Sequence, residues 1–293
     1  MRPLPPGPAP EAIGAPSGLT PAGAPPRVAQ AVVDNWVVSH FAKLEPGLIR
    51  WTGVGGPFEY QLDPLVFMPT LTSEAVVEAL QTIEDIGTVL DVGCGGGFLA
   101  IVAARLGASH VVATDISPAA TALAHKNAAR AGVTDSVSIV CADGIEAFDE
   151  SAMAIDTLVN DISGVPDVVA RRMGWYPEGH KGGGDGIALP LRIIDSSPRL
   201  LRPGRGRLVQ PLGSVQFTPA IRRRLDSLFS RRSVASYRQF FLPREQFSGD
   251  LSDIDALRRQ GRMRLWEARG LLWWDAEVLV CEGLRARRMS AAG

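Results

Sequence analysis

The feature that most constrains the fold is a glycine-rich turn between a strand-like run and a helix-like run. Residues 87–92 (GTVLDV) form a short apolar run, and residues 98–107 (FLAIVAARLG) have the apolar spacing of a helix. Between them, residues 93–97 read GCGGG. Glycines at such a turn let the backbone adopt positive φ angles and approach a ligand closely. This pattern favours a parallel α/β sheet, in which ligands bind outside the carboxyl ends of the strands.

Strand and helix signals alternate through the rest of the chain. A second strand is predicted at 111–115, and the helix after it has Ser117 as N-cap, Pro118 as first residue and Gly132 at its end. Further strands are predicted at 137–142, 156–159, 207–211, 234–241 and 276–281, and further helices at 186–201 and 219–229. The alternation predicts an α/β fold with a Rossmann-like, doubly wound, mostly parallel seven-stranded sheet and a small N-terminal cap.

Composition and periodicity divide the chain into four segments. The first 27 residues contain nine of the 22 prolines and no apolar periodicity. Such a segment cannot bury enough surface to offset its ordering entropy. The expected segments are a disordered tail (1–27), the cap (28–86), the main domain (87–285, with an insertion at 242–272) and a flexible tail (286–293).

The cap is predicted to combine two helices with short strands. Apolar residues in 28–44 have the spacing of an amphipathic helix. Glycines and Pro57 break residues 48–68 into one or two short strands. Ser73 is a suitable N-cap for a helix that runs to about Ile86. We expect these elements to lie against the main domain.

The composition argues against several classes of protein. No apolar run approaches the roughly 18 residues of a membrane-spanning helix, and we expect no secretory signal. Three widely spaced cysteines exclude a disulfide framework and a cysteine-rich zinc module. No His, Asp or Glu pairs have metal-ligand spacing, so we expect no metal. The chain is predicted to be cytoplasmic, without membrane contact, as a monomer or a homodimer.

The two halves of the chain differ in charge. Residues 1–198 contain 11 basic and 22 acidic side chains, whereas residues 199–270 contain 16 arginines and 6 acids. Such asymmetry can mark a nucleic-acid surface. The arginines are dispersed, however, so we favour acidic and basic helices of one domain that neutralise each other. Nucleic-acid binding through the arginine-rich half 199–270 stays as the alternative.

Polar residues follow four strands of the predicted sheet. Asp91 stands two residues before the first glycine, where it can reach a ligand's ammonium group but would repel a pyrophosphate. The glycines also satisfy the G-x-G-x-x-A dinucleotide pattern. The next three strands end in Asp115, Asp143 and Asn160. Together these residues argue against a nicotinamide cofactor.

The pattern D-x-G-x-G-x-G resembles the class I S-adenosylmethionine-dependent methyltransferases, and the resemblance covers about residues 87–211. It implies S-adenosyl-L-methionine as cofactor, with the glycine turn around its methionine part. It also implies that Asp115 binds the ribose hydroxyls, that Ile116 packs on the adenine, and that Asp143, beside Ala142, accepts from the adenine amino group. The implied cofactor-binding residues are Asp91, Gly93, Gly95, Gly97, Asp115, Ile116, Ala142, Asp143 and Asn160.

Other segments resemble the glutamine methyltransferases of release factors and their amino-methylating relatives. Residues 67–70 (FMPT) resemble the segment before their first helix, and residues 182–186 (GGGDG) resemble a later segment. Where those enzymes have Asn-Pro-Pro-Tyr, residues 160–163 read Asn-Asp-Ile-Ser. Loss of the tyrosine removes a stacking platform for a flat acceptor. Asp161, in contrast, can accept a hydrogen bond from an amine and help to remove its proton.

The segment 171–186 is predicted to be a mobile loop beside the acceptor. It can close over the acceptor and exclude water. Trp175 and Tyr176 form either an aromatic wall for an amine or an anchor for the loop. His180 is the histidine placed for catalysis. The predicted catalytic residues are thus Asn160, Asp161 and His180, and the predicted acceptor-binding residues are Ser163, Trp175 and Tyr176.

The leading hypothesis for function is methyl transfer from S-adenosylmethionine to a nitrogen of a small-molecule acceptor of the secondary-metabolite type. Direct in-line displacement requires the enzyme mainly to align donor and acceptor. The alternatives are O- or C-methylation of a small metabolite, methylation of a protein side chain or of RNA, and a cofactor-binding scaffold without catalysis.

Overall fold

A computed structural model of the chain describes residues 40–145, 155–162, 164–177, 180, 184–242, 251–268 and 271–285. The predicted tails at 1–27 and 286–293 lie outside the described residues, as does the part of the first predicted helix before His40.

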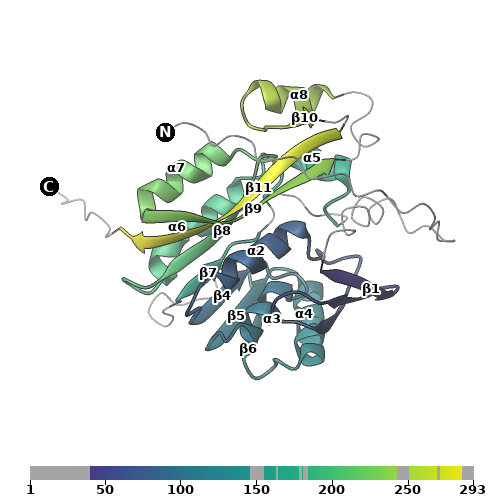
Figure 1. The fold of residues 1–293 in the computed structure, drawn as a ribbon, viewed down its shortest axis with the longest axis vertical. Coiled ribbons are helices and arrows are strands. Elements are labelled where there is room, and N and C mark those ends of the chain that lie inside the picture. The colour runs from purple at the N-terminus through teal and green to yellow at the C-terminus, as the bar shows by residue number, and fades with distance from the viewer. Residues whose placement is uncertain are drawn as a thin grey trace.

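An eight-stranded sheet forms the centre of the molecule (Figure 1). Five strands run parallel in the order β6-β5-β4-β7-β8. Strand β11 pairs antiparallel with β8, with β9 and with the short β10. The strands are β4 (Thr88–Val92), β5 (His110–Asp115), β6 (Val137–Cys141), β7 (Thr157–Val159), β8 (Arg207–Gly213), β9 (Phe229–Leu242), β10 (Trp266–Ala268) and β11 (Leu271–Leu284). The predicted doubly wound α/β fold is confirmed, and β10 adds an eighth strand to the seven that were expected.

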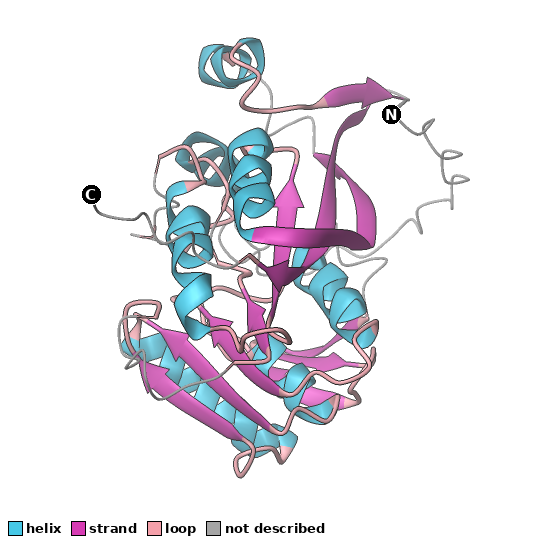
Figure 2. Cartoon of the chain, turned by 90° about the vertical axis from the view of Figure 1, so that its left-hand side faces the viewer, coloured by secondary structure: helices cyan, strands magenta, loops and turns pink. Residues whose placement is uncertain are grey.

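Helices lie on both faces of this sheet (Figure 2). Alternate residues of β4 enter two different cores, because successive side chains of a strand point to opposite faces. Val89 packs with α2, α3 and α4, whereas Leu90 and Val92 pack with α6 and α7. A third core around Trp274 includes residues of α5 and α8. The helices are α2 (Leu71–Gln81), α3 (Phe98–Arg105), α4 (Pro118–Ala131), α5 (Asp167–Met173), α6 (Ala188–Leu200), α7 (Thr218–Leu228) and α8 (Ser252–Arg259).

The start of the described chain is a strand, so the helix predicted over 28–44 is wrong for its last residues. Strand β1 (Phe41–Glu45) pairs antiparallel with β2 (Leu48–Trp51), which pairs with β3 (Phe58–Gln61). Phe41 is buried, with its ring centroid 4.8 Å from that of Trp51 and 5.0 Å from that of Phe98 on α3. Sheet pairing and this aromatic packing outweigh the helical spacing of the local sequence. The small sheet therefore shares a core with the main domain.

Helix α2 begins three residues earlier than predicted. Its N-cap is Thr70, whose Oγ1 accepts from the backbone N–H groups of Thr72 and Ser73 at 3.2 and 3.4 Å. The Ser73 hydroxyl accepts in turn from the Thr70 N–H at 3.3 Å, which completes a capping box. Ser73 is therefore the third helical residue and not the cap. The helix ends at Gln81, before the predicted end at Ile86.

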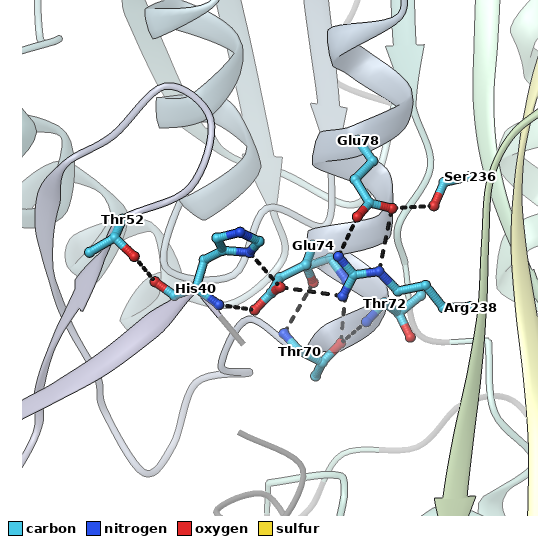
Figure 3. Close-up of polar contacts among 9 residues, drawn as sticks. His40, Thr52, Thr70, Thr72, Glu74, Glu78, Ser236 and Arg238 are labelled. Carbon is cyan, nitrogen blue, oxygen red and sulfur yellow. Dashed lines mark hydrogen bonds and ion pairs between the residues drawn. The ribbon is translucent and has the colours of Figure 1, made fainter. Parts of the chain in front are cut away.

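Charged side chains fasten α2 to the edge strand β9 (Figure 3). Glu74 is 1% exposed and accepts from Arg238 of β9 at 3.3 Å, while His40 contacts it through the backbone N–H and through Nδ1. Glu78, one turn further along α2, pairs with Arg238 and accepts from Ser236. Partial burial opposes ionisation of Glu78, but the hydrogen bonds from Arg238 and Ser236 lower its pKa. These contacts fix the first turn of α2, which carries Ser73.

Candidate cofactor and acceptor site

The glycine-rich turn between β4 and α3 depends on its glycines. Gly93, Gly95 and Gly97 have φ angles of 71°, 53° and 86°, in the region that side chains rarely adopt. A Cβ atom on Gly97 would lie 3.1 Å from the Cβ of Ala124 on α4. A Cβ on Gly95 would lie 3.1 Å from the carbonyl oxygen of Phe67. The turn therefore passes closely between α4 and the segment before α2.

Asp115 joins the end of β5 to this turn. One carboxylate oxygen accepts from the Gly95 N–H and the other from the Ser117 N–H, each at 2.9 Å. Ile116 follows and is 67% exposed, which leaves an apolar surface open beside the turn. Ser117 also caps α4, and Gly132 ends that helix at φ 71°, as predicted.

Asp91 supplies a buried carboxylate beneath the turn. Its side chain is 2% exposed, and Oδ2 has no hydrogen-bond partner within the described residues. Burial, followed by repulsion from Asp161 and Asp115, raises the pKa of Asp91 to about 7. A buried carboxyl group with a free acceptor atom and two acidic neighbours suits a cationic ligand group such as an ammonium.

Asp143 lies after β6 in an ion pair that the sequence did not reveal. Its two oxygens accept from Arg192 of α6 at 2.5 and 3.0 Å, and these hydrogen bonds lower the pKa of Asp143. The neighbouring Ala142 donates its backbone N–H to the Asp115 carbonyl at 2.9 Å. An adenine amino group would therefore compete with Arg192 for Asp143.

Asn160 and Asp161 lie at the end of β7. Asn160 is fully buried, and its side-chain amide donates to the Pro190 carbonyl at 3.2 Å and to Gln210 Oε1 at 2.6 Å. Asn160 Oδ1 has no hydrogen-bond partner in the described part of the chain. Asp161 Oδ2 accepts from the Ser73 hydroxyl at 2.9 Å, and burial raises the pKa of Asp161 to about 7.

The predicted loop 171–186 begins later than expected, because α5 continues to Met173 and Gly174 ends it at φ 62°. Trp175 packs against Trp274 with 5.8 Å between ring centroids, in the anchoring arrangement. The Tyr176 hydroxyl donates to the Val165 carbonyl at 2.8 Å. Ser163, Glu178 and the glycines at 182 and 183 lie outside the described residues.

Phe67 joins this loop to the glycine turn and was missed by the sequence analysis. Its ring centroid lies 5.2 Å from that of Tyr176 and 5.0 Å from that of the exposed His180. Its carbonyl oxygen faces Gly95, as described above. Phe67 thus lies between the glycine turn and the residues Tyr176 and His180.

The arginine-rich half 199–270 is largely neutralised by ion pairs. Of its fourteen described arginines, at least eleven pair with acidic side chains. A cleft of about 350 Å³ beside α7 contains two of these pairs, Arg222 with Glu277 and Arg264 with Asp275. This arrangement matches the favoured interpretation of the charge asymmetry.

The described ranges contain no cluster of three or more His, Cys, Asp or Glu residues suited to a metal ion. A search of the same ranges finds no helix with the length and apolar character needed to cross a membrane.

The sequence profile of the ribosomal protein L11 methyltransferase (PrmA) family matches residues 70–164, which run from the N-cap of α2 past Asp161. This stretch contains the glycine turn, Asp91, Asp115, Asp143 and Asn160. These matches support the class I S-adenosylmethionine-dependent methyltransferase that the sequence predicted.

Several known proteins are similar to parts of this chain. The release factor glutamine methyltransferase of Cereibacter sphaeroides is 35% identical over 158 residues, which cover 50% of this chain and 54% of that protein. The L11 methyltransferase of Geobacter metallireducens is 37% identical over 127 residues, 39% of this chain and 42% of that protein. The aligned part of the chain therefore spans about half the length of these relatives, or less. A solved L11 methylase from Lactobacillus delbrueckii subsp. bulgaricus has a TM-score of 0.45 and 19% identity, over 75% of this chain and 83% of that one.

Proposed function

We propose that this chain transfers a methyl group from S-adenosylmethionine to a nitrogen of a protein side chain. The observation that carries this proposal is the pair formed by Asn160 and Asp161 at the end of β7: an amide oxygen without a partner in the described chain lies next to a carboxyl group whose pKa is about 7. The first offers an acceptor for an N–H group, and the second offers a base that is active near neutral pH.

The cofactor-binding residues would be those around the glycine turn. Asp91 would accept from the ammonium of the methionine part, and Asp115 and Ile116 would hold the ribose and the adenine. When bound, S-adenosylmethionine supplies a methyl group on a sulfonium, which is an excellent leaving group. The chain's own task is then alignment of the acceptor nitrogen.

Asp161 would prepare the acceptor for attack. An amine is largely protonated at neutral pH and has no free lone pair until it loses a proton, and an amide nitrogen must lose a proton as its new bond to the methyl group forms. A carboxyl group whose pKa lies near 7 can take that proton directly or through water. Asn160 would orient the same nitrogen, while Phe67, Tyr176 and His180 would form the wall of its entrance.

Two observations favour a protein acceptor over the small molecule that led the sequence-based hypothesis. The relatives named above act, by name, on a release factor and on ribosomal protein L11. The arginines that were considered for RNA binding are mostly paired with acids, which disfavours RNA. Acceptors of the translation apparatus would also place the reaction in the cytoplasm.

The test is methylation of purified ribosomal protein L11 and of a bacterial release factor with tritiated S-adenosylmethionine. We expect the label to enter one of these proteins and to survive removal of RNA. Asp161→Asn should reduce kcat by about a hundredfold or more, whereas the exposed control Asp135→Asn should not. Label that enters RNA or a small amine, with both proteins unlabelled, contradicts the proposed acceptor.

A further inference from the structure

A buried chain of side-chain amides lies behind the acceptor end of the site. Gln210 of β8 is 1% exposed, and its Nε2 donates to the Pro211 carbonyl at 2.8 Å. Its Oε1 accepts from Asn160 Nδ2 at 2.6 Å. Asn160 Nδ2 also donates to the Pro190 carbonyl at 3.2 Å. A hydrogen-bonded chain therefore runs from one backbone carbonyl to another.

The two backbone carbonyls at its ends determine how both amides are oriented. A carbonyl oxygen only accepts, so the Pro211 carbonyl requires the NH₂ group of Gln210. This leaves Oε1 of Gln210 facing Asn160, so Asn160 must donate to it from its own NH₂ group. Reversal of the Asn160 amide would set two acceptor oxygens against each other at this position and would leave the Pro190 carbonyl without its donor.

We propose that Gln210 is a positioning residue that holds Asn160 with its carbonyl oxygen directed away from β8, as the acceptor for a ligand N–H group. That oxygen is buried and has no hydrogen-bond partner in the part of the chain that the structure describes. A buried acceptor without a partner costs free energy, so its orientation must be imposed by the surrounding groups. The inference rests on the proposed function for the identity of the ligand, but the orientation itself is independent of it.

The sequence offers a direct way to observe this amide. The chain contains three asparagines, at positions 35, 127 and 160. Selective ¹⁵N-asparagine labelling therefore gives three side-chain amide signals, and Asn160→Asp identifies that of Asn160. Asn127 is an internal reference, because its amide is also buried and donates to the carbonyls of Gln61 and Gly96 at 3.1 and 3.0 Å.

The experiment compares hydrogen exchange of these signals in the wild type and in Gln210→Met, which removes the acceptor. We expect the Asn160 amide to be protected in the wild type and to exchange about tenfold faster in Gln210→Met, with Asn127 unchanged. Gln210→Glu, held protonated by burial, keeps an acceptor oxygen for Asn160 and an O–H donor for the Pro211 carbonyl, and it should retain protection. The same replacement at the exposed Gln239 should have no effect.

A kinetic measurement separates positioning from stability. With L11 or release factor as acceptor, kcat/KM of Gln210→Met should fall about tenfold to a hundredfold, while the Kd for S-adenosylhomocysteine stays within about threefold. An Asn160 amide that exchanges freely in the wild type, or is unchanged in Gln210→Met, overturns the inference. The exchange measurement does not require an acceptor. It therefore distinguishes failure of this inference from failure of the proposed function, in which neither protein is methylated.

Discussion

Two carboxyl groups, the buried Asp91 and the partly buried Asp161, are central to the proposed chemistry of the site. The pKa of each is raised to about 7, chiefly by burial, and Asp161 adds to the shift of Asp91. An aspartate whose folded-state pKa lies above its unfolded value of about 3.9 binds a proton more tightly in the folded protein. Its protonation therefore favours folding at low pH, and this contribution is lost as the pH rises through about 7.

Cofactor affinity should depend on pH in the opposite sense. In the proposed site an ammonium group would bind the ionised form of Asp91, so affinity for S-adenosylhomocysteine should weaken as the pH falls below about 7, by up to tenfold per unit. Calorimetry at about pH 5.5, 6.5 and 7.5 measures this dependence, because these pH values lie on both sides of the Asp91 pKa of about 7. Asp91→Asn should remove most of this pH dependence and should bind S-adenosylhomocysteine more weakly at high pH. At high pH it should also raise the melting temperature of the ligand-free protein, because it removes a buried charge. Equal affinity of the wild type across this pH range would show that Asp91 does not bind the ammonium group.

Ser73 should act through Asp161. Its hydroxyl donates to Asp161 Oδ2, and this hydrogen bond lowers the pKa of the carboxyl group against the effect of burial. Ser73→Ala should therefore move the acidic limb of the kcat/KM profile to higher pH and reduce kcat about tenfold at neutral pH. Ser73→Thr keeps a hydroxyl and should restore the profile. Thr72→Ala, on the same helical turn, is the control. If the pH profile of Ser73→Ala matches that of Thr72→Ala, Ser73 serves only to cap the helix.

The site residues that the sequence predicted and those that it did not predict differ in how far their partners lie along the chain. Asp91 and the glycines follow one another in a motif whose backbone geometry is local, so spacing alone predicts them. Ser73 lies 88 residues from Asp161 along the chain, and Gln210 lies 50 residues from Asn160. No local pattern encodes such pairs, because the sheet order brings them together.

At the scale of elements, the contact between α2 and β9 determines where Ser73 stands. Arg238 is the cation that faces both Glu74 and Glu78, and Glu74 is almost fully buried. Arg238→Met should destabilise the protein by about 3 kcal/mol, because it leaves the Glu74 carboxylate without its strongest partner. Urea unfolding measures this change. Arg231→Met on the same strand breaks the exposed pair with Glu282 and should cost about 1 kcal/mol or less. Equal effects of the two substitutions would contradict a structural role for this contact.

Elements with strong local signals were predicted best. Helix α4 has a serine cap, a proline at its first position and a glycine at its end, and these three signals agree with the structure. Strand β1 has helical apolar spacing, but pairing with β2 and burial of Phe41 against Trp51 decide its conformation. Tertiary packing overrides a weak local preference.

At the scale of the whole molecule, the acidic and arginine-rich halves of the sequence interlock. Arg202 and Arg205, from the arginine-rich half, pair with Asp156, and Arg262 pairs with Asp185. The separation of charge along the sequence thus disappears in three dimensions. Composition alone could not show this, because it depends on which strands and helices become neighbours.

The measurement that most directly tests the central claim is calorimetric titration with S-adenosylhomocysteine and with NAD. We expect binding of S-adenosylhomocysteine and little affinity for NAD, because Asp91 suits an ammonium and would repel a pyrophosphate. Asp115→Ala should weaken the binding of S-adenosylhomocysteine by about 1.5–3 kcal/mol, because hydrogen bonds to a charged group are lost. Binding of NAD without binding of S-adenosylhomocysteine would contradict the account.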